Sequence, residues 1–348
     1  MKETFTAAVL REHFTPLSLE TLKAETPEKG QVLVKMITSG LCGAQINEID
    51  AVKGVDKYMP HLMGHEGFGK VLEVGADVRK VKVGDYVVLH WRKGSGHECF
   101  GGKYHGEKDV VGSGSVTTFA EQTIVAENRV TKVEYDPELK DLYPLMGCAL
   151  STAYGIAKYN VRRTKEDDLT PSVVITGAGG LGLTIAFWLK VLYNITPIML
   201  DKHSSKRKYV EDIGAVFFTL DETPFEFLAK VNYVIDTTGS TDVMSDGFDL
   251  IKKPGALILV GQPRIGQKLV LNNALSLFDG ISIYSSDGGN FDPDLDLDDI
   301  VKHVKNNLEL AKKLVTHTIK LDQINDGFSM MRNGEAGRVI INFEESAQ

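Results

Sequence analysis

The chain has few cysteines, and they lie far apart. Cys42, Cys99 and Cys148 are the only three in 348 residues. An odd number at such spacing excludes a disulfide framework and favours a reduced, cytoplasmic setting. The N-terminal residues lack the continuous apolar core of a signal peptide. The most apolar helical segment, near residues 181–192, is interrupted by Lys190 and is too short to cross a bilayer.

Positive charge is also in deficit. Lys and Arg number 39 against 47 Asp and Glu, which leaves a net charge of −8. This charge repels phosphate backbones and anionic membranes, so we expect a small-molecule substrate and neither a nucleic acid nor a membrane as partner. With 43% hydrophobic and 25% charged residues, the composition is that of a globular protein, and its length suggests two domains.

The pattern of predicted elements changes near residue 150. Earlier segments favour short strands, VLVKMI, GKVLEV and YVVLHW, followed by a polar, glycine-rich loop over residues 92–115. Later apolar strands alternate with helices, as in SVVITG, TPIMLD and NYVIDTTG. This alternation is typical of an α/β fold with a doubly wound parallel sheet. The tail predicts a helix over residues 298–314 and a closing strand, RVIINF.

A glycine-rich turn joins one of these strands to its helix. In SVVITGAGGLG the residues Gly177, Gly179 and Gly182 have G-x-G-x-x-G spacing. Following a strand and opening a helix, this loop, with Gly180 and Leu181, is predicted to hold a dinucleotide pyrophosphate at the helix N-terminus. A plain glycine turn is the alternative.

Asp201 ends the next strand, about twenty residues further on. Its carboxylate suits both hydroxyls of an adenosine ribose and repels a 2′-phosphate, which favours NAD over NADP. The cations that follow, Lys202, Lys206 and Arg207, weaken this preference.

Three further residues could bind a metal. Cys42, His65 and Cys148 are flanked by glycine and precede the glycine loop. Taken singly, each cysteine is more often a small buried residue, and the histidine a structural one. Together they offer two thiolates and an imidazole, three zinc ligands with a fourth position open. Such a site suits alcohol chemistry, because zinc lowers the pKa of a bound hydroxyl and polarises a carbonyl.

On these residues, and on GHEGFGKVLEVGADVRKVKVGD, KPGALILVG and GRVIINF, the chain resembles the zinc-dependent medium-chain dehydrogenase/reductase family of alcohol, polyol and sugar dehydrogenases. The resemblance implies a GroES-like catalytic domain from residues 1–152 and 286–348, around a Rossmann NAD-binding domain at residues 153–285. It also implies a homodimer or homotetramer, for which the strand candidate ISIYSS offers an edge.

The resemblance assigns roles to single residues. The two cysteines and His65 would hold one catalytic zinc, with Glu66 beside it as a supporting or alternate ligand. Thr152 would border the nicotinamide, Lys206 the adenosine ribose and Arg338 the pyrophosphate. Trp91 would line the substrate pocket, although ordinary core packing explains it equally well.

The chain departs from the family pattern in its polar loop. Many relatives hold a second, structural zinc there with four closely spaced cysteines, whereas this loop has only Cys99. We therefore expect no structural zinc. An improvised cluster of His97, Glu98, Cys99 and His105 is the less favoured alternative to a solvated loop.

A second departure follows Cys42. The family usually places a hydroxyl residue, an aspartate and a histidine in this segment, whereas this chain has Ala44, Gln45 and Asn47. The usual proton relay is therefore absent, and we expect the proton to leave through water, a substrate hydroxyl, His90 or Glu66. The Gln45 carbonyl is expected to accept the imidazole N–H of His65.

Asn47, His90, Trp91 and the polar loop favour a hydroxylated substrate. The expected reaction is hydride transfer between NAD(H) and a secondary alcohol or its ketone, with a polyol, cyclitol or sugar derivative as substrate. Two alternatives remain: a zinc-independent enoyl or quinone reductase of the same fold, and a nucleotide-binding relative without catalysis.

Overall fold

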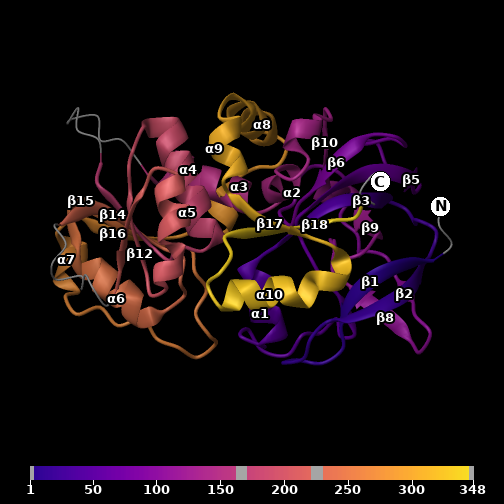
Figure 1. Cartoon of the computed structure of the whole chain (residues 1–348), viewed down its shortest axis with the longest axis horizontal. Helices are drawn as coiled ribbons and strands as arrows, with labels where there is room; N and C mark the ends of the chain where they lie inside the picture. Colours follow the sequence, from indigo (N-terminus) through magenta and orange to yellow (C-terminus); the bar gives the residue numbers. More distant parts are fainter. Residues whose placement is uncertain (1–3, 162–170, 221–229, 345–348) are drawn as a thin grey trace.

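The computed structural model describes residues 4–161, 171–220 and 230–344. Figure 1 shows a β-rich unit on one side and a parallel sheet with helices on the other. Both ends of the chain lie in the β-rich unit, because the tail crosses back to it after the parallel sheet is complete. The α/β fold expected from the sequence is confirmed.

The β-rich unit contains a small barrel and a larger sheet. The closed barrel has the order β1 (Phe5–Leu10), β2 (Ser18–Ala24), β7 (Tyr104–His105), β8 (Val110–Ser113) and β4 (His61–Leu62). The sheet has the order β10 (Val130–Val133), β6 (Tyr86–Leu89), β5 (Gly67–Val74), β3 (Gln31–Leu41), β18 (Arg338–Asn342) and β17 (Val315–Ile319), with β9 (Gln122–Ala126) also on β3. The C-terminal β18 thus pairs with β3, which leads directly to Cys42.

The second unit is a parallel sheet of six strands. Its order is β13 (Val216–Thr219), β12 (Ile198–Asp201), β11 (Val173–Thr176), β14 (Val231–Asp236), β15 (Ile251–Leu259) and β16 (Ile281–Ser285). Successive residues of β11 pack on opposite faces: Ile175 joins the core below α4 (Gly180–Tyr193), and Val174 joins the core below α6 (Thr241–Asp249). Burial on both faces explains the unbroken apolar run in the sequence.

Helices between the two units form a shared core. They are α2 (Tyr143–Met146), α3 (Ala149–Gly155), α8 (Leu297–Asn306) and α9 (Leu308–Lys312), packed beside α4. Trp188 of α4 is fully buried, lies edge-on to Tyr154 and donates its indole N–H to the Leu150 carbonyl at 2.8 Å. The helix that begins after Cys148 is therefore held against the helix that begins at the glycine loop.

Two expectations need correction. The tail helix predicted over residues 298–314 is divided into α8 and α9 at Asn307, whose ψ of 36° is not helical. The polar loop predicted over residues 92–115 contains the short strands β7 and β8, which complete the barrel. Their pairing is through the backbone, and the side-chain pattern of the loop does not indicate it.

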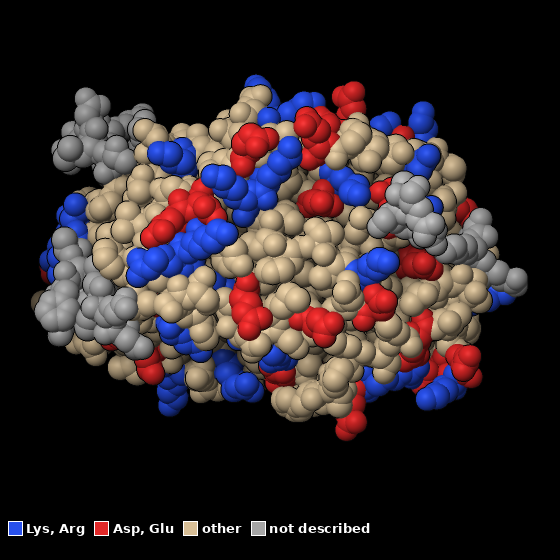
Figure 2. Space-filling model, in the orientation of Figure 1, with Lys and Arg blue, Asp and Glu red and all other residues tan. Residues whose placement is uncertain are grey.

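The remaining helices are short: α1 (Gly43–Ile49), α5 (Arg207–Asp212), α7 (Leu275–Phe278) and α10 (Ile324–Arg332). Among the described residues, no helix has both the length and the apolar character needed to span a membrane. On the face drawn in Figure 2, acidic and basic side chains are interspersed.

Candidate active site

Three expected metal ligands converge although they lie far apart in the chain. Cys42 follows β3 and caps α1, His65 precedes β5, and Cys148 caps α3. One possible ligand atom from each lies within 4.8 Å of the other two. Within residues 4–161, 171–220 and 230–344, this is the only group of three or more such residues close enough to share an ion.

The two sulfurs of this cluster contact each other, and the contact shifts their pKa values in opposite directions. The contact between them lowers the pKa of Cys42 well below its usual value and, with burial, raises the pKa of Cys148 well above. One negative charge is therefore favoured at these half-buried thiols, and a cation there would stabilise it and allow the second thiol to ionise.

The cluster has the donor chemistry of a zinc site. Nδ1 of His65 contacts the Gln45 carboxamide, while its Nε2 is buried and finds no hydrogen-bond partner in the part of the chain that the structure describes. A buried ring nitrogen without a partner, next to two sulfurs, is the donor set that tetrahedral zinc takes, with the fourth position left for another ligand. The residues present thus fit the metal that the sequence suggests.

Gln45 makes different contacts from those expected. Its Oε1 accepts the backbone N–H of Cys42 at 3.0 Å, and its Nε2 faces Nδ1 of His65. The expectation that its carbonyl accepts the imidazole N–H is wrong, because the open N-terminus of α1 already uses that oxygen.

Glu66 and Arg338 form a buried ion pair beside the cluster. Their side chains are 0% and 2% exposed, and a guanidinium N–H of Arg338 donates to Oε1 of Glu66. Burial raises the pKa of Glu66, although the charge of Arg338 opposes it. Oε2 of Glu66 and Nε of Arg338 have no hydrogen-bond partner among the residues described. Gly40 makes room for the carboxylate, since a Cβ there would lie 2.7 Å from Oε1.

Arg338 also lies at the glycine loop. A side chain at Gly180, the first residue of α4, would overlap the aliphatic part of Arg338. The arginine therefore spans from the N-terminus of α4 to Glu66 and joins the expected pyrophosphate site to the expected metal site.

The glycine loop has the geometry that its spacing predicts. Gly177 has φ +93°, a conformation that suits glycine, and a side chain at Gly182 would overlap the Gly177 carbonyl. Asp201 lies at the end of β12, where its carboxylate accepts backbone N–H groups of Ala178 at 2.7 Å and His203 at 2.9 Å. These bonds hold the carboxylate beside the loop, as a ribose-binding role requires.

Lys206 points elsewhere than expected. It is only 4% exposed, and its ammonium donates to the Ala336 carbonyl in the returning tail. Burial lowers its pKa, while the nearby Asp201 opposes the shift. Its neighbours Ser205 and Tyr209 donate to the Gly334 and Glu335 carbonyls. The segment after Asp201 therefore clamps the tail that carries Arg338.

Trp91 and Thr152 flank one glycine turn. A side chain at Gly288 would overlap the Trp91 ring, and one at Gly289 the Thr152 carbonyl; both glycines have positive φ, at +61° and +70°. Trp91 also stacks with Arg92, whose guanidinium carbon is 5.8 Å from the ring centroid. The turn from β16 thus lies between the two residues expected near substrate and nicotinamide.

The other two expected pocket residues, His90 and Asn47, differ in how deeply they are buried. His90 is buried, and its ring nitrogens contact the Arg92 carbonyl at 2.7 Å and the Thr131 hydroxyl at 2.9 Å. Burial lowers its pKa to about 3. This arrangement favours a structural role over contact with a substrate or proton transfer. Asn47 is half-buried in α1.

Glu48 also lies near the cluster, although no motif in the sequence points to it. It lies on α1, where burial raises its pKa and the charges of His65, His61, Asp56 and Cys42 act on it. His61 is in turn bonded to Asp56 at 2.6 Å. In the sequence, only the position of Glu48, six residues after Cys42 on the same short helix, indicates that it lies near the cluster.

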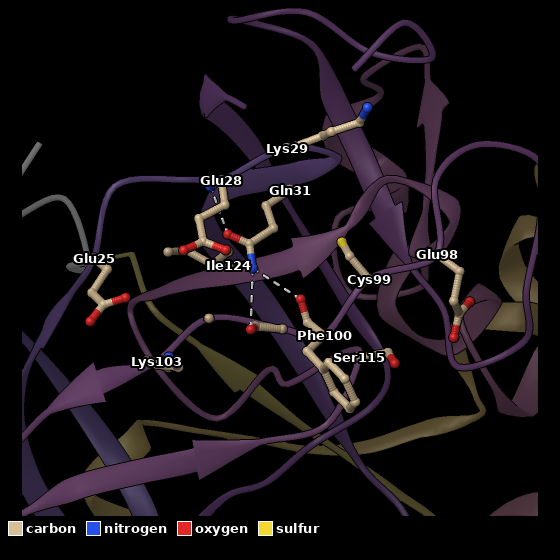
Figure 3. A pocket seen from close by; sticks show the side chains of 12 residues that line it. Glu25, Glu28, Lys29, Gln31, Glu98, Cys99, Phe100, Lys103, Ser115 and Ile124 are labelled. Carbon is tan, nitrogen blue, oxygen red and sulfur yellow. Dashed lines mark hydrogen bonds between the residues drawn. The ribbon is translucent and has the colours of Figure 1, made fainter. Parts of the chain in front are cut away.

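The possible ligands in the polar loop each have another partner. His97 and Glu98 bond to Glu127 and Asn128, Cys99 bonds to the Gly30 carbonyl at 3.3 Å, and His105 bonds to Glu25. Figure 3 shows the cavity of about 480 Å³ beside Cys99, where the Gln31 amide bonds the Phe100 carbonyl. The cavity is lined by none of the three clustered residues.

Comparison with known proteins agrees with this geometry. Residues 28–135 match the family described as alcohol dehydrogenase GroES-like domain, and residues 153–342, more than half of the chain, match the glucose dehydrogenase C-terminus family. Alcohol dehydrogenase 6 of Peromyscus maniculatus is 26% identical, covering 96% of each chain.

Solved structures show the same fold. Benzyl alcohol dehydrogenase from Acinetobacter calcoaceticus superposes with a TM-score of 0.85 at 23% identity, covering 98% of this chain and 99% of that one. An alcohol dehydrogenase from E. coli CFT073, solved with NADH, superposes with a TM-score of 0.79 at 20% identity, covering 98% and 100%.

Proposed function

The chain belongs to the zinc-dependent medium-chain dehydrogenase/reductase family, and from this premise we propose that it transfers hydride between NAD(H) and a secondary alcohol or ketone. Its relatives make it an oxidoreductase of the alcohol dehydrogenase type that acts on CH–OH groups. The observation that carries the finer proposal is the convergence of Cys42, His65 and Cys148 within 4.8 Å.

Cys42, His65 and Cys148 would hold one catalytic zinc, and we propose no structural zinc. When bound, zinc supplies Lewis acidity that favours the ionised form of an alcohol or polarises a carbonyl. The chain's own residues orient this site: Gln45 contacts His65, and Arg338 holds the Glu66 carboxylate beside it without solvent contact. The Arg338 guanidinium compensates the negative charge of Glu66 through Oε1. Oε2 has no partner among the described residues and could accept a further hydrogen bond or approach the metal.

We assign the dinucleotide to the glycine loop of residues 177–182. Free N–H groups at the start of α4 and the guanidinium of Arg338 offer positive charge to a pyrophosphate. Asp201 would accept the ribose hydroxyls and disfavour a 2′-phosphate, and the buried Lys206 is turned away toward Ala336. These contacts favour NAD, which the NADH complex of the structural relative also supports.

The proposed substrate is a polyol, cyclitol or sugar derivative. Half-buried Asn47 on α1 offers a polar contact, and Trp91, stacked against the Gly288 turn, offers a flat wall of the kind that sugar rings pack on. Thr152 would border the nicotinamide from the other side of that turn. Residues 1–152 and 286–348 would form the catalytic domain and residues 153–285 the nucleotide domain.

The test combines metal analysis with a substrate panel. Zinc content of the purified chain is measured together with NAD-linked oxidation of polyols, cyclitols, sugars and simple primary alcohols. We expect one zinc per chain and preference for hydroxylated secondary alcohols. Activity on conjugated double bonds without zinc would replace the proposal by an enoyl or quinone reductase. NADH binding without turnover on any substrate would indicate a non-catalytic relative.

We also propose a homodimer through the edge of the nucleotide domain. β16 is the last strand of its sheet, and the apolar Leu275 and Phe278 of α7 beside it are exposed, Phe278 to 87%. Phe278→Asp should therefore yield monomers in sedimentation, whereas Phe100→Asp, at another exposed phenylalanine, should not. If the wild type is a tetramer, this interface would be one of its two kinds of subunit contact, and Phe278→Asp should then yield dimers.

A further inference from the structure

Gln45 lies between two of the three residues that would hold the metal. It is completely buried in the first turn of α1, three residues after Cys42. Its Oε1 accepts the Cys42 backbone N–H at 3.0 Å, and its Nε2 faces Nδ1 of His65. One carboxamide therefore serves both the backbone of one expected ligand and the ring of another.

This arrangement selects a tautomer of His65. A carboxamide nitrogen can only donate, so Nδ1 must accept, and the single proton of a neutral ring must then be on Nε2. A protonated Nε2 has no lone pair for a metal. The contacts seen here thus favour the tautomer of His65 that does not bind zinc.

Zinc binding at Nε2 changes the hydrogen-bond role that Gln45 must take, from donor to acceptor. The ring proton then lies on Nδ1, so two donors, the Cys42 N–H and the His65 Nδ1–H, face one side chain. A carboxylate has an acceptor oxygen for each donor, whereas a carboxamide has one oxygen. Whichever way the Gln45 amide is turned, one buried donor faces an NH₂ group.

We propose that Gln45 is a positioning residue that links the tautomer of His65 to metal occupancy and keeps the zinc affinity of this site below that of a carboxylate at the same position. This inference rests on the proposed zinc site. Zinc occupancy then varies with zinc supply over a range in which a carboxylate-supported site is already saturated.

Zinc affinity tests this directly. Competition with a chromophoric chelator is measured for the wild type, Gln45→Asp and Gln323→Asp. Gln323 is the matched control, because it also lies three residues after its cap and accepts the backbone N–H of Lys320 at 3.0 Å. We expect Gln45→Asp to bind zinc about 10- to 100-fold more tightly, the usual scale for groups that support a ligand, and Gln323→Asp to match the wild type.

Nitrogen NMR of the His65 ring supplies a readout independent of activity and of the variant's folding. In the wild type we expect the proton on Nε2 without zinc and on Nδ1 with zinc. In Gln45→Asp we expect it on Nδ1 in both states. Equal zinc affinity in wild type and Gln45→Asp, or a metal-free wild type already protonated at Nδ1, overturns this inference alone. Absence of zinc binding in every variant overturns the proposed function as well.

Discussion

Two clusters of ionisable side chains in the β-rich unit differ in how fully their polar atoms are satisfied. In the metal-type cluster of Cys42, His65 and Cys148, Nε2 of His65 has no hydrogen-bond partner among the described residues. The contact between the two sulfurs lowers the pKa of Cys42 and raises that of Cys148. One possible ligand atom from each of these residues lies within 4.8 Å of the other two, which is the arrangement that a cation completes.

The second cluster is centred on Glu127, which is 2% exposed. Its Oε1 accepts the backbone N–H groups of Arg79 at 2.5 Å and Lys80 at 2.7 Å, and its Oε2 accepts the backbone and ring N–H of His97, both at 2.8 Å. Burial raises the pKa of Glu127, but these bonds outweigh it and lower the pKa to about 2. A carboxylate thus anchors the polar loop with no need of an ion.

Proximity of His, Cys and Glu does not by itself make a metal site. Both clusters contain residues that bind metals elsewhere, and both are partly buried. Among the described residues, only the first cluster has a buried ring nitrogen without a hydrogen-bond partner, beside two sulfurs. A buried polar atom without a partner is costly unless something binds it. Three predictions test this distinction, and a fourth tests the proton route beside the metal-type cluster.

The largest effect is expected from His65→Ala. Two sulfurs alone leave a tetrahedral set incomplete, so zinc should fall below about half an equivalent per chain. Activity should fall more than about a hundredfold, beyond the loss seen for groups that only support a ligand. Metal analysis and kcat/KM measure both. His97→Ala is the control and should keep its zinc. Loss of zinc in this control would contradict the difference between the metal-type cluster and the Glu127 cluster.

Glu127→Gln should lower the free energy of unfolding by about 3 kcal/mol at pH 7, the equivalent of its pKa shift at 1.36 kcal/mol per unit. Because the folded pKa of about 2 lies below the ordinary 4.5, this stability is present above pH 4.5 and is lost as pH falls toward 2. Urea unfolding at pH 7 and pH 3 measures it. Glu98→Gln, whose side chain is 42% exposed, should cost clearly less; equal losses would refute an anchoring role.

Cys99→Ala should cost about 1 kcal/mol, the scale of one hydrogen bond, because it removes the contact from Sγ to the Gly30 carbonyl. Zinc content should stay at the wild-type value, whereas Cys148→Ala should lose the metal. Denaturation and metal analysis separate the two effects. A loss of zinc in Cys99→Ala would place a metal in the loop.

The smallest effect is expected from Ala44→Thr, which restores a hydroxyl two residues after Cys42. If another route already carries the proton, turnover and its pH profile should change by less than about twofold, roughly 0.4 kcal/mol. Ala44→Val, which has nearly the same shape without the hydroxyl, is the control. A large rate gain in the threonine variant only would show that the relay is missing rather than replaced.

Much of the fold could be predicted because its signals are local. The strand, glycine loop and helix from Val173 to Tyr193, and the carboxylate of Asp201, follow from apolar runs and from the backbone freedom of Gly177. The convergence of the three metal-type residues was inferred from family resemblance, since nothing local relates Cys42 to Cys148. The placements of His90, Lys206 and Gln45 could not be inferred, because each depends on a hydrogen bond to a residue that its own segment does not reveal.

The parallel sheet, the phosphate loop and the side chains able to bind a metal can be predicted from the chain alone, since these depend on periodicity and residue type. Which of those side chains find a hydrogen-bond partner depends on how distant segments pack together. Glu66 meets Arg338 across 272 residues, and His97 meets Glu127 across 30. The pairing of polar atoms is a property of the folded packing. It distinguishes a cluster whose polar atoms still lack partners, and so can bind a ligand, from one whose polar atoms are already hydrogen-bonded.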